Sequence, residues 1–132
     1  MKSVIEKSII ESISNEMNEF NNYYKKTLNS NVKLINTVIN YITRQKGKQL
    51  RPSICILSAN LCGKANKNTF KAAALIEMIH VATLMHDDVV DESTIRRGWP
   101  SVNSIWKNKI SILVGDYMFS KALTNMIEIE NF

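Results

Sequence analysis

The segment from Thr69 to Asp91 constrains the fold of this chain more than any other stretch. Drawn as a helix, it is apolar around most of its circumference and carries a single polar stripe. Other elements have to surround such a helix, because an exposed apolar circumference is unfavourable in water. We therefore expect a central helix, whose apolar positions are Ala72, Ala74, Leu75, Met78, Val81, Ala82, Met85 and Val89.

The elements around this segment should also be helices. The 132 residues include only four glycines and two prolines, too few turn-forming residues for many short strands. Apolar residues recur at helical spacing on both sides of the central segment. We predict an all-α fold, with helices near Ser3–Leu28, Val32–Gln45, Pro52–Leu61 and 110–129 and a short helix near Val102–Trp106.

The net charge of +5 is spread along the chain. Lysines occur from Lys2 to Lys121 without a long basic block and without interleaved aromatic residues, so a nucleic-acid partner is not expected. No apolar run approaches the roughly twenty residues of a membrane span, and residues 1–11 lack the apolar core of a secretory signal. We therefore expect a cytoplasmic protein with no transmembrane segment.

Three aspartates at the end of the central segment form a candidate metal site. Asp87 and Asp91 lie one turn apart on one face of a helix, and Asp88 flanks them. Like charges at this spacing destabilise an isolated helix. Magnesium keeps several waters and is held by one or two carboxylates together with substrate phosphate oxygens. The three aspartates therefore predict a Mg²⁺-diphosphate site; the alternative is a solvated acidic helix end.

Basic residues on either side of this motif suggest further phosphate contacts. Lys48 and Arg51 flank the start of a helix, where backbone amides and the helix dipole favour an anion. Arg96 and Arg97 follow the aspartates and can hold phosphate oxygens bidentately. His80 lies two turns before the aspartates on the same stripe, about 10 Å away along the axis. Together these residues predict two diphosphates, one bound directly and one through the metal ion.

These motifs, in this order, resemble the N-terminal part of the trans-polyprenyl diphosphate synthases. The resemblance rests on Gly47–Pro52, Glu77–Asp91, Arg96–Gly98 and Gly115–Tyr117, and it covers roughly Lys33 to Leu123. It implies the N-terminal part of the isoprenoid synthase helical bundle. It also implies the family's reaction, in which an allylic diphosphate ionises, the alkene of isopentenyl diphosphate attacks the cation head-to-tail, and a proton is lost.

The resemblance assigns a role to each candidate residue. It implies that one set holds isopentenyl diphosphate and that a second set binds the allylic diphosphate through Mg²⁺. The first set is Lys48, Arg51 and His80, with Arg97 as a further contact, and the second is Asp87, Asp88 and Asp91, supported by Arg96.

The length of the product in this family depends on side chains one turn or more before the aspartates, where a bulky aromatic ring blocks the growing chain. Ala82 and Thr83 stand at these positions. Small side chains there are similar to those of the long-chain enzymes that make quinone side chains, such as octaprenyl diphosphate synthases.

Members of this family are considerably longer and carry a second aspartate-rich motif on a later helix. The chain ends at Phe132 without such a motif. We therefore expect residues 1–132 to be an incomplete polyprenyl synthase domain that is inactive alone, a truncated or split form. Family resemblance implies a homodimer, and the missing part implies a complementary chain.

Two other functions compete with this one. A non-catalytic helical subunit would keep the fold without turnover, although every binding residue expected in this span is present. A carboxylate-bridged metal bundle needs repeated Glu-x-x-His sets. Glu77 and His80 have that spacing, but no second set occurs. We therefore favour the prenyltransferase.

Overall fold

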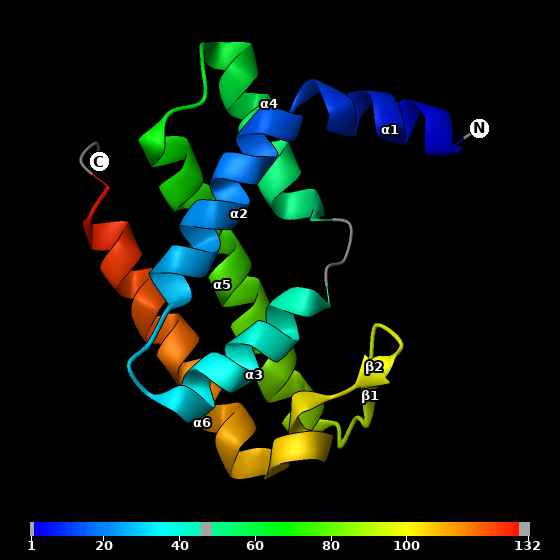
Figure 1. Cartoon of the computed structure of the whole chain (residues 1–132), viewed down its shortest axis with the longest axis vertical. Helices are drawn as coiled ribbons and strands as arrows, with labels where there is room; N and C mark the ends of the chain where they lie inside the picture. Colours follow the sequence, from blue (N-terminus) through cyan, green and yellow to red (C-terminus); the bar gives the residue numbers. More distant parts are fainter. Residues whose placement is uncertain (1, 46–48, 130–132) are drawn as a thin grey trace.

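A computed structural model describes residues 2–45 and 49–129 (Figure 1). The helices are α1 (Lys2–Ser12), α2 (Ser14–Leu28), α3 (Lys33–Arg44), α4 (Leu50–Cys62), α5 (Lys67–Val90) and α6 (Val102–Ile127), and a short hairpin consists of β1 (Ile95–Arg96) and β2 (Trp99–Pro100). This confirms the all-α fold predicted from the sequence. Within the described ranges, no helix has the length and apolarity needed to cross a bilayer.

Helix α5 is central, as predicted. It packs against α6, α4 and α2, most extensively against α6 (Figure 1). Ala73, Ala74, Met78 and Ala82 of α5 have no exposed surface. Three of these four side chains are alanines, which occupy little space and allow the surrounding helices to come close. The polar stripe of α5 is thereby left to face the space that α6 does not cover.

A capping box starts α5 two residues earlier than the sequence predicted. The side chain of Asn66 accepts hydrogen bonds from the backbone N–H groups of Asn68 (2.9 Å) and Thr69 (3.3 Å). The hydroxyl of Thr69 in turn accepts a hydrogen bond from the backbone N–H of Asn66 (3.1 Å). Such a cap stabilises a helix by about 1 kcal/mol. The central helix therefore begins at Lys67.

Helices α1 and α2 replace the single helix expected from Ser3 to Leu28. The backbone leaves helical geometry at Ile13, with φ −119° and ψ 20°, and the Ile13 side chain is buried in the core. Ile5 and Ile9 are exposed, because α1 projects away from the bundle (Figure 1). The expectation of one continuous helix was wrong, since apolar periodicity does not reveal where the chain turns to insert a side chain into the core.

The hairpin lies between α5 and α6. Arg96 pairs with Trp99 across it, so Arg97 and Gly98 form a two-residue turn. Their φ angles are 55° and 77°, the positive values that a type I′ turn requires. Glycine adopts such angles without strain, whereas arginine does not. The tip of the hairpin therefore holds Arg97 in a strained backbone conformation.

Helix α6 contains a bend at Lys107, where φ is 71° and ψ is 165°. It therefore consists of a short helix and a longer one, as the sequence predicted. Asn125 in the longer part is buried and joins three helices: its amide donates to the carbonyl of Lys71 on α5 (2.6 Å), and its side-chain oxygen accepts from the hydroxyl of Tyr23 on α2. A buried amide with both bonds made sets the position of α6 against α2 and α5.

Candidate functional site

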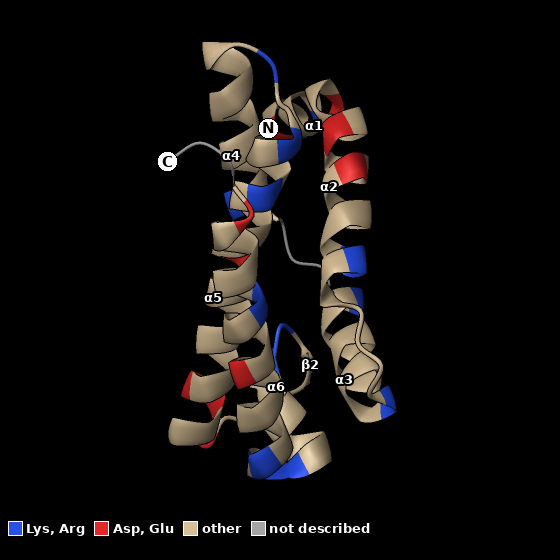
Figure 2. Ribbon diagram, turned by 90° about the vertical axis from the view of Figure 1, so that its left-hand side faces the viewer, with Lys and Arg blue, Asp and Glu red and all other residues tan. Residues whose placement is uncertain are grey.

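The polar stripe of α5 leads from the middle of the bundle to one end. Glu77 and His80 are half-buried, and Asp87 and Asp91 are exposed. Figure 2 shows the acidic residues gathered at the end of the α5–α6 pair and the basic hairpin turn near them. Four of the residues discussed in the sequence analysis therefore follow one another along α5, and the two aspartates at its end are the exposed ones.

Asp88 is not accessible in the way that its two neighbours are. It is only 5% exposed and forms a bidentate ion pair with Arg96, with Nη2–Oδ1 at 2.5 Å and Nε–Oδ2 at 3.2 Å. The hydrogen bond that Arg96 donates to Asp88 raises the pKa of the Arg96 guanidinium. Asp88 thus anchors the hairpin to the end of α5.

Asp87 and Asp91 are the carboxylates that remain available for a cation. They lie one turn apart, since the backbone N–H of Asp91 donates to the carbonyl of Asp87 at 2.8 Å. Over the described ranges, no three His, Cys, Asp or Glu side chains are grouped closely enough to hold a metal ion by themselves. Two carboxylates nevertheless suit Mg²⁺, which takes its other ligands from water and phosphate. The expected convergence of three carboxylates is replaced by an exposed pair.

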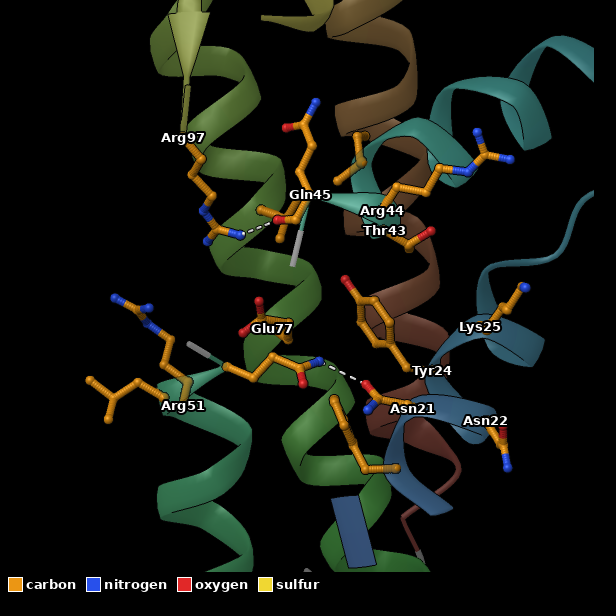
Figure 3. A pocket seen from close by; sticks show the side chains of 15 residues that line it. Asn21, Asn22, Tyr24, Lys25, Thr43, Arg44, Gln45, Arg51, Glu77 and Arg97 are labelled. Carbon is orange, nitrogen blue, oxygen red and sulfur yellow. Dashed lines mark hydrogen bonds between the residues drawn. The ribbon is translucent and has the colours of Figure 1, made fainter. Parts of the chain in front are cut away.

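A pocket of about 540 Å³ lies beside the stripe, between α2, α3, α4, α5 and the hairpin (Figure 3). We call it the inner pocket. Arg51 at the start of α4 and Arg97 at the tip of the hairpin both line it, together with Glu77 of α5. The Nη1 of Arg97 donates to the carbonyl of Gln45 at 3.0 Å. Two guanidinium groups from distant parts of the sequence therefore share one cavity.

A smaller cavity of about 40 Å³ connects this pocket to the aspartates. Gln45 and Arg97 line both cavities, and the smaller one also reaches Asp88 and Arg96. The side-chain nitrogen of Gln45 is buried and has no hydrogen-bond partner among the described residues. The inner pocket and the buried Asp88–Arg96 pair are thus separated only by the small cavity that Gln45 and Arg97 line.

The charges in this region act on each other. Burial raises the pKa of Glu77, and the positive charges of Arg97 and Arg51 partly counter this effect. Burial lowers the pKa of His80, and the nearby arginines lower it further. Burial also raises the pKa of Tyr24 in the same pocket. His80 is therefore a neutral imidazole at pH 7, and the positive charge of the region comes from its arginines.

The remaining predicted residues fall in different places. Lys48 lies outside the described residues. Ala82 is fully buried in the core, whereas Thr83 is exposed and its hydroxyl donates to the carbonyl of His80 at 2.7 Å. Glu77, which lies one turn before His80 and which the sequence assigned with it to the diphosphate site, lines the inner pocket.

The Gly115–Tyr117 motif has a packing role that the sequence did not reveal. Gly115 of α6 is buried, and a Cβ there would overlap the ring of His86, with Cδ2 only 2.7 Å away. The Nε2 of His86 lies 3.4 Å from Asp116 Oδ1 and 3.3 Å from the carbonyl of Ile112. The absence of a side chain at Gly115 therefore lets α6 approach α5 next to the aspartates.

The family model for polyprenyl synthetase matches residues 32–132, which include all the site residues described above. The chain belongs to this family. The polyprenyl synthetase fold is also evident in solved structures. A decaprenyl diphosphate synthase from Rhodobacter capsulatus superimposes with a TM-score of 0.90 at 36% identity, covering 96% of this chain and 39% of that one. A polyprenyl synthase from Caulobacter crescentus CB15, complexed with calcium and isoprenyl diphosphate, gives 0.90 at 35% identity, again covering 96% of this chain and 39% of that chain.

The curated relatives in the polyprenyl synthetase family include synthases named for long-chain products and others named for geranylgeranyl diphosphate. The all-trans-nonaprenyl-diphosphate synthase of Rhodobacter capsulatus is 38% identical over 93% of this chain, and the octaprenyl diphosphate synthase of Escherichia coli (strain K12) is 48% identical over 75%. These matches cover 38% and 31% of the relatives. The chain therefore spans about a third of the length of the relatives that it matches.

Proposed function

We propose that the chain is part of a polyprenyl diphosphate synthase, a transferase that condenses isopentenyl diphosphate head-to-tail with an allylic diphosphate. One observation supports this most directly: Arg51 and Arg97 line a single pocket beside α5, and the same helix ends in the exposed pair Asp87 and Asp91. A direct anion site and a metal-binding site on one helix suit two diphosphate substrates.

The inner pocket is our candidate site for isopentenyl diphosphate. Arg51 and Arg97 would hold phosphate oxygens through bidentate hydrogen bonds, and Lys48 is proposed to join them. His80, being neutral, would offer one N–H donor without adding charge. The strained turn at Arg97 and its bond to Gln45 hold one guanidinium toward the pocket before any ligand arrives.

Asp87 and Asp91 are our candidate ligands for Mg²⁺, and Asp88 supports them through Arg96. These two carboxylates would hold Mg²⁺, which would stabilise the negative charge of the diphosphate group as its bond to the allylic carbon breaks. The chain's own residues orient this site, because the Asp88–Arg96 pair holds the end of α5 against the hairpin. The calcium and isoprenyl diphosphate in the related Caulobacter crescentus structure support this assignment.

The proposal extends to the length of the product. Thr83 is exposed on α5 between His80 and Asp87, and we propose that it contacts the growing prenyl chain. Ala82 is buried, and its small side chain acts by leaving room in the core. The octaprenyl and nonaprenyl names of the relatives support a long-chain product. We propose isoprenoid biosynthesis, including quinone side chains, as the process.

We further propose that residues 1–132 form an incomplete synthase domain, completed by further helical chain from the same or a complementary polypeptide. The share of the relatives that the chain spans, about a third, supports this. A homodimer and a cytoplasmic location are part of the same proposal.

The test measures substrate binding and turnover separately. Calorimetry would measure the binding of two ligands to the 132-residue chain: farnesyl diphosphate in the presence of Mg²⁺, and isopentenyl diphosphate in its absence. Asp87→Ala should weaken the binding of farnesyl diphosphate with Mg²⁺ by about tenfold or more. Arg51→Gln should weaken the binding of isopentenyl diphosphate to a similar extent, because each variant loses a charge-assisted contact. Glu19→Gln, which removes an exposed carboxylate of α2, is the control.

Prenyl transfer is then assayed with labelled isopentenyl diphosphate. Binding without turnover would support an incomplete domain. Adding the missing helices would then distinguish this domain, which should gain activity, from a non-catalytic subunit, which should not. Long polyprenyl products that disappear in Asp87→Ala would show that this span assembles a working site. Absence of both bindings would overturn the proposed function.

A further inference from the structure

A second large cavity lies between α2 and α3, and no residue of the motifs discussed above lines it. Its volume is about 550 Å³. We call it the outer groove. Its basic residues are Lys25, Lys26 and Arg44, and its polar residues include Asn22, Asn40 and Thr43. No acidic residue is among the described residues that line it.

The three basic side chains of the outer groove are not neutralised within the described part of the chain. Neither Lys25, Lys26 nor Arg44 forms a side-chain hydrogen bond or ion pair with a described residue. Other basic residues have such contacts: Lys71 donates to the carbonyl of Glu128, for example. Three uncompensated cations around one concave surface create a local positive potential, whereas scattered cations on a convex surface are screened by solvent.

The outer groove is continuous with the inner pocket. Lys25, Thr43 and Arg44 line both cavities. Figure 3 shows Lys25 and Arg44 on the side of the pocket away from Arg51, with Tyr24 between them and Glu77. An anion held in the groove is therefore next to the pocket that contains the arginine pair.

We propose that the outer groove is a second anion site, which captures the diphosphate group of a prenyl substrate before it enters the inner pocket. Two lysines provide point charges and Arg44 provides a planar fork of donors, a combination that suits a diphosphate. Thr43 and the asparagines add neutral donors. The identity of the ligand rests on the proposed function, whereas the charge of the groove does not.

Inorganic diphosphate without Mg²⁺ is the probe, titrated into the full 132-residue chain by calorimetry. We expect two diphosphates per chain. Lys25→Gln/Arg44→Gln removes two cations that line both cavities, so it should weaken the inner diphosphate slightly and the groove diphosphate by about tenfold for each cation removed. Lys26→Glu reverses a charge that lines only the groove and should weaken the same site alone.

Two matched variants separate the sites. Arg51→Gln/Arg97→Gln should weaken only the other diphosphate. Lys7→Gln/Lys109→Gln removes two exposed cations elsewhere, so it has the same net charge as the groove variant and should leave both sites intact. Circular dichroism of every variant shows whether it is folded.

Each outcome decides the proposal. Loss of one diphosphate in both groove variants, with the control unchanged, supports it. Unchanged stoichiometry in the groove variants, or an equal loss in the Lys7/Lys109 control, overturns it. Co-sedimentation with anionic phospholipid vesicles that depends on Lys26, without a second diphosphate site, also overturns it in favour of a lipid surface. If the groove variants each lose one diphosphate but Arg51→Gln/Arg97→Gln binds diphosphate like the wild type, the proposed function is overturned and the anion site in the outer groove is supported.

Discussion

The guanidinium of Arg96 and the carboxylate of Asp88 face each other with two nitrogen–oxygen contacts, at 2.5 Å and 3.2 Å, on a carboxylate that is almost fully buried. This pair connects the hairpin to the helix that carries the candidate metal ligands. It explains why Asp88 is buried, whereas the other two aspartates of the motif are exposed.

Removing one partner of this pair should destabilise the fold. Arg96→Met leaves the buried Asp88 carboxylate without its counter-ion; breaking a fully buried pair costs about 3–5 kcal/mol, and partial exposure of Arg96 reduces this to about 1–3 kcal/mol. The free energy of unfolding is measured by urea denaturation. Asp87→Asn, which alters an exposed neighbour, should change it by less than about 0.5 kcal/mol. Equal stability of Arg96→Met and the wild type would show that the pair is not formed.

Gly115 should not tolerate a side chain. In Gly115→Ala the added Cβ overlaps the His86 ring, so we expect a loss of about 1–3 kcal/mol of stability from overpacking. The thermal midpoint of unfolding checks this, with the exposed Ser120→Ala on the same helix as control. A gain in stability, as expected for Gly→Ala in an unhindered helix, would contradict the close packing of α6 on α5.

Asn125 should be needed for the docking of α6. Asn125→Ala removes the bonds to Tyr23 and Lys71 and leaves buried polar groups without partners, at a cost of about 1–3 kcal/mol. The change is read by urea unfolding against Thr124→Ala, the exposed neighbour on the same helix. If the two variants have the same free energy of unfolding, the contact of Asn125 with α2 and α5 is absent in solution.

Glu77 should make stability depend on pH. Its pKa is raised above the ordinary value of 4.5, mainly by burial, so the folded state binds this proton more tightly than the unfolded state. Its contribution is most favourable below pH 4.5 and is lost as the pH rises through the raised pKa. Glu77→Gln should therefore gain stability relative to the wild type between pH 4.5 and pH 7.5. The free energy of unfolding of both proteins is measured as a function of pH. A constant difference between them across this range would refute the raised pKa of Glu77.

Much of this arrangement was predictable from local sequence. Apolar residues at helical spacing in residues 69–91 indicated the central helix, and the scarcity of glycine and proline indicated an all-α fold. The spacing of Asp87 and Asp91 put them one turn apart, because helix geometry alone determines that relationship. The short helix before Lys107 was predicted for the same reason, and the bend follows it.

Other features depended on contacts between distant segments. The break at Ile13 arises because that side chain enters the core, which the periodicity of the first helices does not report. The tight hairpin turn returns Arg96 to Asp88, and so it decides which aspartates stay exposed.

Local periodicity and composition were thus sufficient for the helical class and the central helix, because both depend on residues within a few turns of one another. The motifs were identified by their resemblance to a known family, and each of them is a short stretch of sequence. Tertiary packing decided that Arg51 and Arg97 share one pocket and that Lys25 and Arg44 border it from the other side. Those relationships join residues from different helices and from a hairpin. Only the packing of α2 and α4 against α5, and of α3 against α6 and α2, brings their charges together. Electrostatic effects depend on the separation of charges in space rather than along the chain.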